Sequence, residues 1–228
     1  MTTRNAIFHT ATVSYRVPGP LAEMAAVAYN LQYAKPLVEN LLAGNKPDDT
    51  DSQLIRLGDR ELTLTTIFGS HPYDRERRVC AIGIGDDPER SVVASDRAWF
   101  NFHASALFGD VLERHTRHTQ DVQRRVPGLP IKGAETVGVA YELDYLNAAV
   151  DAALERNQPT GDEMHVVTAP EVTLMRADIF GRHPLDPGRN VRVGGIADRH
   201  YRALAAAEQA WRNFHISLLF AATALGAA

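Results

Sequence analysis

One stretch of this chain is written twice: AWFNFHASALF at residues 98–108 returns as AWRNFHISLLF at residues 210–220. Sliding the sequence against itself by 112 positions aligns residues 22–108 with residues 134–220 without a gap, and 33 of the 87 pairs are identical. A period of this length indicates that one structural unit is duplicated within the chain. Any fold for this protein has to accommodate the same pattern of elements twice.

Each copy predicts a helix, three strands and a second helix. In the first copy, residues 22–44 carry apolar side chains at helical spacing, and Gly-Asp and His-Pro turn signals separate three strand-like segments, 53–57, 61–68 and 77–84. Asp86 and Asp198 stand where the second helix needs an N-cap. The predicted fold class is α+β, with two α-β-β-β-α repeats related by a pseudo-twofold axis.

The two final helices, expected over residues 88–115 and 200–222, carry a face of small and amide side chains, which in the first copy includes Ala94, Ala98 and Ser105. Small residues let two helix backbones approach closely, so we expect these long helices to pack against each other. The expected division is a first repeat with an N-terminal strand at 1–115, a linker at 116–132 and a second repeat at 133–228.

Composition excludes several classes of protein. A formal net charge of −4 with dispersed basic residues provides no footprint for nucleic acid or an anionic membrane. The single cysteine, Cys80, excludes an intrachain disulfide and favours a reducing compartment, and we expect a cytoplasmic protein. The apolar stretch 216–228 is too short to cross a bilayer. It predicts a buried or subunit-facing helix end, through which copies could form a homo-oligomer.

Many of the residues shared by the two copies are polar, although packing alone would mainly preserve apolar positions. The shared polar set that we single out is Glu23/Glu135, Tyr29/Tyr141, Tyr33/Tyr145, His71/His183, Asp74/Asp186, Arg77/Arg189, Asp86/Asp198, Arg90/Arg202, Asn101/Asn213, His103/His215 and Ser105/Ser217.

The HPxD turn, written at His71–Asp74 and again at His183–Asp186, is the first candidate site. A carboxylate three residues from a histidine could orient it as a general base. With His103 or His215 added, the set becomes two histidines and one carboxylate, which could hold a divalent metal. The alternative is a hairpin turn in which proline fixes the backbone and the aspartate bonds nearby amides.

The other repeated polar residues also have two interpretations each. His103 and His215 could be ligands, or hydrogen-bonded residues of the core. The guanidinium groups of Arg77 and Arg189 could clamp a substrate carboxylate, or pair with Asp74 and Asp186. Tyr29 and Tyr33 are expected on one face of the first helix. Their phenols, and that of Tyr141 in the second copy, could contact a substrate, or pack against a neighbouring helix with a satisfied hydroxyl.

No dinucleotide fingerprint, P-loop, HExxH or GxSxG motif occurs, so no nucleotide cofactor is expected and a divalent metal is the cofactor these residues could hold. Two hypotheses remain. The first is a small-molecule enzyme, a hydrolase, lyase or oxygenase, that uses the HPxD turn and the NFH helix. The second is a non-catalytic pseudodimeric protein, ligand-binding or scaffold, in which these residues are structural.

Overall fold

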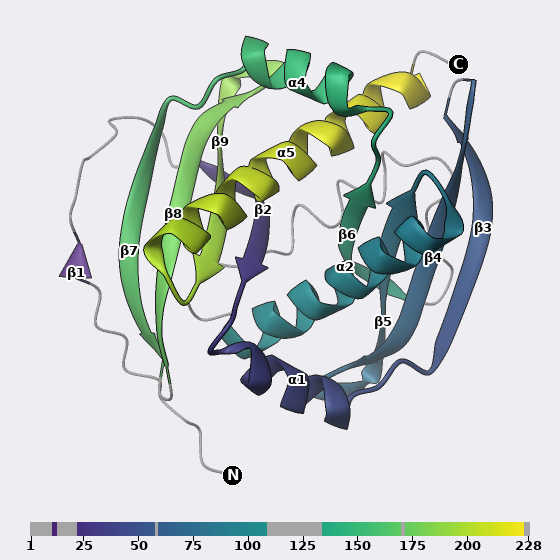
Figure 1. Ribbon diagram of the computed structural model, residues 1–228, viewed down its shortest axis with the longest axis vertical. Helices are drawn as coiled ribbons and strands as arrows, with labels where there is room; N and C mark the ends of the chain where they lie inside the picture. Colours follow the sequence, from purple (N-terminus) through teal and green to yellow (C-terminus); the bar gives the residue numbers. More distant parts are fainter. Residues whose placement is uncertain (1–10, 13–21, 58, 109–133, 170–171, 226–228) are drawn as a thin grey trace. The chain divides into compact units, whose positions relative to one another are not determined.

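A computed structural model describes residues 11–12, 22–57, 59–108, 134–169 and 172–225. Within them the protein is α+β, with four helices and two sheets (Figure 1). The chain forms two compact units. Unit 1 comprises the described residues of 1–36 and 157–211, and unit 2 those of 37–156 and 212–228. Each unit therefore combines segments from both halves of the chain.

The sheet of unit 2 has four strands in the order β3-β4-β5-β6. The first three, β3 (Asp49–Leu57), β4 (Arg60–His71) and β5 (Asp74–Gly85), form an antiparallel meander. The fourth strand, β6 (Glu135–Glu142), comes from the other half of the chain and pairs with β5 in parallel. The three strands predicted in the first copy are thus confirmed, with Cys80 fully buried on β5.

The sheet of unit 1 follows the same plan. Three antiparallel strands, β7 (Gly161–Ala169), β8 (Val172–His183) and β9 (Asp186–Ala197), are joined in parallel by β2 (Glu23–Asn30) from the first half of the chain. A two-residue strand, β1 (Ala11–Thr12), pairs with the outer edge of β7.

Strand registers in the two sheets agree position by position at an offset of 112. Asp49 lies opposite Phe68 in the first sheet, and Gly161 lies opposite Phe180 in the second. The parallel pairs agree as well, since Val79 opposite Glu135 corresponds to Val191 opposite Glu23. The bulges also recur at matching positions, after Ser70 and after Arg182 among others.

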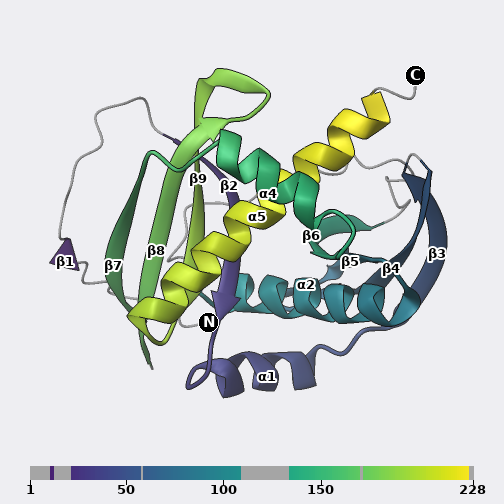
Figure 2. The ribbon, with the colours of Figure 1, turned by 45° about the horizontal axis from the view of Figure 1, so that its top comes forward.

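Helices cover both faces of the sheet in unit 2. Helix α2 (Pro88–Phe108) lies across β4, β5 and β6 and buries Ala94, Ala98 and Trp99 against them (Figures 1 and 2). The opposite face buries Leu62, Leu64, Ile82 and Ile84 against α4 (Asn147–Arg156) and the end of α5 (His200–Leu225). Helix α1 (Lys35–Gly44) buries Val38. This three-layer arrangement gives unit 2 an apolar cluster on each face of its sheet.

The prediction of one helix over residues 22–44 is wrong. Residues 23–30 form β2, and the helix begins only at Lys35. In the second copy, β6 is likewise followed by α4. The order of elements in each repeat is therefore β-α-β-β-β-α. Alanine-rich EMAAVAYN has helical propensity, but parallel pairing with β9 overrides it. Tyr29 and Tyr33 therefore share no helix face, and Pro36 lies in the first turn of α1, where proline is tolerated.

The small side chains of the long helices lie close to the sheets. A Cβ added at Gly83 on β5 would lie 2.1 Å from backbone atoms of Ser91 and Ser95 in α2. In unit 1, a Cβ at Gly195 would lie equally close to Ala203 and Ala207 of α5. The close approach seen at Ala94 and Ala98 is to the sheet and not the expected one between helices. Packing between the long helices stays a prediction, and residues 109–115 lie outside the described residues.

No helix in the described part of the chain is long and apolar enough to cross a membrane.

Replacing Gly83 or Gly195 by alanine should lower the free energy of unfolding by about 3 kcal/mol, because backbone atoms of the helix occupy the space that a methyl group needs. Gly44→Ala is the control. Nothing lies within 4 Å of a Cβ at Gly44, so its effect should stay below about 1 kcal/mol. Urea denaturation measures all three. Equal effects at Gly44 and Gly83 would contradict the close helix–sheet contact.

Candidate functional site

The HPxD turn connects β4 to β5. His71 ends β4 and lies opposite Asp74, which begins β5. The amide N–H of Tyr73 donates to Nδ1 of His71 at 3.2 Å, and the amide N–H of Glu76 donates to Oδ1 of Asp74 at 3.3 Å. Both side chains thus bond backbone amides of their own turn, as a tight hairpin requires.

The second HPxD turn repeats these contacts. The amide N–H of Leu185 donates to Nδ1 of His183 at 3.2 Å, and that of Gly188 donates to Oδ1 of Asp186 at 3.3 Å. His183 is buried and Asp186 is exposed. The same local bonds therefore accompany the motif in both copies.

His71 and His103, which the sequence could not place relative to each other, converge on one aromatic ring. The ring centroid of Phe102 lies 5.5 Å from that of His71 and 5.1 Å from that of His103. Burial lowers the pKa of both imidazoles, and the nearby Arg77 guanidinium adds to the effect on the pKa of His71. Both histidines are therefore biased toward the neutral form.

Hydrogen bonds occupy both ring nitrogens of His103. The side-chain amide of Asn45 donates to the carbonyl oxygen of Ser70 at 2.8 Å, so this atom is Nδ2, and it lies 2.9 Å from Nε2 of His103. Nε2 must then accept. Nδ1 carries the hydrogen and donates it to the carbonyl oxygen of Trp99 at 2.9 Å. No lone pair is left for a metal or for a substrate proton.

Asn45 is a site residue that the sequence interpretation missed. It is identical to Asn157 at the offset of 112, and the side chain of Asn157 donates to the carbonyl oxygen of Arg182 as that of Asn45 does to Ser70. Its identity in both copies was the available signal. Its position just after a helix concealed the contact with β4, which only the fold creates.

Arg77 does not pair with Asp74 as one interpretation proposed. Its Nε and Nη2 donate to the carboxylate of Glu135 on β6 at 2.7 and 2.6 Å. This bidentate bond, which raises the pKa of Arg77, ties β5 to the parallel strand beside it. The guanidinium is thus engaged in joining two strands.

The repeated tyrosines and the remaining arginine lie on the paired strands. Tyr29 lies on β2 and Arg189 on β9. Tyr141 on β6 is buried, and its hydroxyl lies 3.0 Å from Oγ of Ser217, which itself donates to a backbone carbonyl. The phenol therefore donates to Ser217. Burial raises the pKa of Tyr141 to about 12, so it stays protonated.

The described residues contain no group of three or more histidine, cysteine, aspartate or glutamate side chains that could hold a metal ion. The predicted set of His71, Asp74 and His103, and its repeat with His183, Asp186 and His215, is therefore not assembled as a metal site. His215 lies buried on α5.

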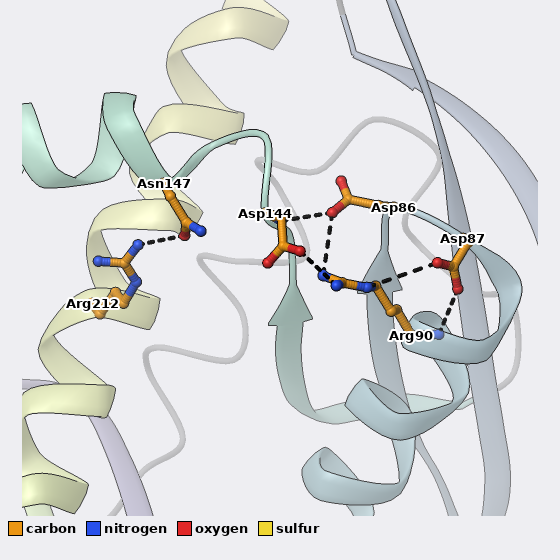
Figure 3. Close-up of polar contacts among 6 residues, drawn as sticks. All are labelled: Asp86, Asp87, Arg90, Asp144, Asn147 and Arg212. Atoms are coloured by element: carbon orange, nitrogen blue, oxygen red, sulfur yellow. Dashed lines mark hydrogen bonds and ion pairs between the residues drawn. The ribbon is translucent and has the colours of Figure 1, made fainter.

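Asp86 was expected to cap α2, and this is wrong. Asp87 caps it, since the amide N–H of Arg90 donates to Oδ1 of Asp87 at 2.9 Å. Asp86 instead accepts the amide N–H of Asp144 at 2.6 Å, and Arg90 pairs with Asp144 at 2.5 Å (Figure 3). Asp86 thus binds the end of β6 to the end of β5.

Asp198 makes the corresponding bonds in unit 1. Its carboxylate accepts the amide N–H groups of Gln32, Tyr33 and Ala34, the last two at 3.0 and 2.9 Å. These amides precede α1. The repeated aspartate therefore holds the turn after the parallel strand in each unit.

A second group of polar side chains, absent from the sequence interpretation, lies on one face of β7, β8 and β9. We call Glu163, His165, Arg176, Asp178 and Arg192 the charged cluster. Asp178 is 1% exposed. Arg176 donates to its Oδ1 through Nε and Nη2 at 3.1 and 3.0 Å, and Nη1 of Arg192 lies 3.9 Å from its Oδ2.

His165 lies between the two carboxylates of the charged cluster. Its Nε2 is 3.4 Å from Oε2 of Glu163 and 3.7 Å from Oδ2 of Asp178. The alternation of charged residues along β7 and β8 was the signal in the sequence. The residues at these positions differ between the two copies, so the shared residues do not reveal them.

A scan against protein-family models finds no match to this chain, and a search of curated proteins finds none either.

Stability should fall as the pH is lowered through about 6.5, because the pKa of His103 is lower in the folded protein than the ordinary value of 6.5. Between the two pKa values the unfolded chain binds more protons, which favours unfolding, and His71 contributes in the same direction. Urea denaturation at several pH values measures this: in His103→Gln the unfolding free energy should fall less between pH 7 and pH 5 than in the wild type.

His200→Gln, at an exposed position, is the control and should keep the wild-type dependence on pH. An unchanged dependence in His103→Gln would contradict the lowered pKa of His103 in the folded protein.

Proposed function

We propose that this protein is a non-catalytic, ligand-binding pseudodimer in which the residues written twice hold the fold together. The observation that carries the proposal is the saturation of His103, whose two ring nitrogens are both hydrogen-bonded inside the protein. Asp86, Asp198 and Arg77 support it, since each binds a neighbouring strand or turn.

Duplication of one ancestral unit is part of the proposal. Two sheets with the same strand order, registers and bulges at an offset of 112 support a common origin for the two halves. A pseudo-twofold relation would then descend from a homodimer in which each subunit lent a strand to the other. The parallel pairs β5–β6 and β2–β9 correspond to that exchange.

A small-molecule enzyme with an acid–base site at the HPxD turn is the second candidate. It is favoured by His71, whose pKa is lowered, as a base that is neutral at pH 7 requires. Asp74 follows three residues later, but its Oδ1 accepts an amide hydrogen of the turn. The first candidate therefore has more support.

A double-mutant cycle tests the proposal. Asn45→Ala and His103→Ala should each lower the unfolding free energy by about 1–3 kcal/mol, because the first leaves buried Nε2 of His103 without its partner and the second removes the same bond together with a buried ring. The double variant should cost clearly less than the sum, since both changes remove the same contact. Additive losses in urea denaturation would count against the structural role.

His71→Ala separates the two candidates. Under the structural proposal it changes stability slightly and leaves ligand binding unchanged, because its ring nitrogen bonds only its own turn. If the variant folds with wild-type stability but no longer binds a ligand that the wild type binds, the enzyme with a site at the HPxD turn is the better explanation.

A further inference from the structure

We propose that an exposed, positively charged corner of unit 1 binds a second copy of this chain, through a negatively charged corner on unit 2 of that copy. The inference goes beyond the proposed function and does not rest on it. We call Tyr33, Asp198, Arg199, Tyr201 and Arg202 the basic corner. We call Asp86, Asp87, Glu89, Arg90 and Asp144 the acidic corner.

Two tyrosine side chains of the basic corner are exposed to solvent. Tyr33, in the turn after β2, is 63% exposed, and Tyr201, in the first turn of α5, is 67% exposed. The guanidinium carbon of Arg199 lies 5.3 Å from the centroid of the Tyr33 ring. That of Arg202 lies 5.9 Å from the centroid of the Tyr201 ring. Tyrosine and arginine are the residue types that are enriched at protein–protein interfaces and among their strongest contacts.

The two arginines of the basic corner have no ion-pair partner among the residues that the structure describes. No carboxylate oxygen there lies within 4.0 Å of the guanidinium group of Arg199 or Arg202. Asp198, next to Arg199 in the sequence, accepts backbone amides instead. Helix α5 has no acidic residue in its first turn, and cations at the start of a helix are repelled by its dipole. These charges therefore do not stabilise α5, whereas an acidic surface brought to them would be attracted.

The acidic corner carries the opposite charge. Its single arginine, Arg90, pairs with Asp144 at 2.5 Å (Figure 3). The carboxylates of Asp86 and Asp87 lie 3.6 and 3.8 Å from the same guanidinium group. Glu89 is exposed. Four carboxylates and one guanidinium group leave three negative charges on this corner, whereas two guanidinium groups and one carboxylate leave one positive charge on the basic corner.

The two corners have the same backbone arrangement and differ in side chains. Each lies where a parallel pair of strands ends, and in each an aspartate, Asp86 or Asp198, accepts amide hydrogens of the turn beyond the added strand. The charge therefore differs without a change in the fold of the corner. At the offset of 112, the residues Gln32, Arg199 and Tyr201 correspond to Asp144, Asp87 and Glu89.

Charge complementarity selects the occupant of the basic corner. Like charges disfavour contact between two basic corners or between two acidic corners, whereas a basic and an acidic corner attract each other. Every copy of the chain carries one corner of each kind. A contact between unlike corners is heterologous, so it can continue from one copy to the next.

Sedimentation velocity of the full-length protein over a range of concentrations tests the inference. In about 0.02 M sodium chloride, the weight-average mass should rise above that of one chain as the protein concentration increases. In about 0.5 M sodium chloride it should return toward the mass of one chain, because salt screens exposed charges.

Charge reversal on either corner should weaken the association at least about tenfold, because it places like charges opposite each other. Arg199→Glu changes the basic corner, and Glu89→Arg changes the acidic corner; both positions are exposed. Mixing the two variants should restore association, since the intact acidic corner of one meets the intact basic corner of the other. Arg75→Glu, at an exposed position near the start of β5, is the matched control and should leave association unchanged.

Tyr201→Ala tests the aromatic contribution without changing the charge. It should weaken the association about tenfold, because an exposed tyrosine that becomes buried at an interface contributes strongly to binding. Tyr73→Ala is the control, since Tyr73 is 61% exposed but lies in the turn between β4 and β5.

A protein that keeps the mass of one chain at every concentration in low salt would overturn the inference. Association that Arg199→Glu and Glu89→Arg leave unchanged, or that Arg75→Glu weakens as much, would overturn it as well. These outcomes are distinct from failure of the proposed function, which the coupling between Asn45 and His103 measures inside unit 2.

Discussion

Parallel pairing between strands from opposite halves of the chain is the interaction on which both units depend. β6 completes the sheet begun by β3, β4 and β5, and β2 completes the sheet formed by β7, β8 and β9. Parallel neighbours cannot be joined by a tight turn, so each added strand comes from a distant segment of the chain. Asp86 and Asp198 reinforce the backbone pairing by accepting amide hydrogens just beyond the paired strand. Each sheet therefore contains strands from both halves of the chain.

The polar residues that both copies retain make contacts that hold the fold together. Arg77 donates to Glu135 across a parallel pair of strands, and Asn45 donates both to His103 and to the end of β4. In the two HPxD turns, the histidines accept amide hydrogens of their own turn. A buried polar group that loses its partner costs about as much as a lost apolar contact. Retention of such groups in both copies is therefore compatible with a structural role, and it is a weak guide to chemistry.

The two halves of the chain differ at the positions of the charged cluster. Positions that pack a leucine and a threonine in one sheet carry an arginine and an aspartate in the other, on the same register. The same strand registers therefore accommodate an apolar set of side chains in one unit and a charged set in the other.

The sequence by itself determined the period of 112, the three antiparallel strands of each copy and the hairpin at HPxD, because turn signals and strand alternation are local properties of neighbouring residues. It did not determine that EMAAVAYN is a strand, since this depends on pairing with β9 some 170 residues away. Nor did it determine that Asp86 binds the end of β6, or that Asn45 meets His103. Only the tertiary structure decided these contacts, because a carboxylate, an amide or a run of small apolar residues takes its partner from whichever segment the fold places beside it.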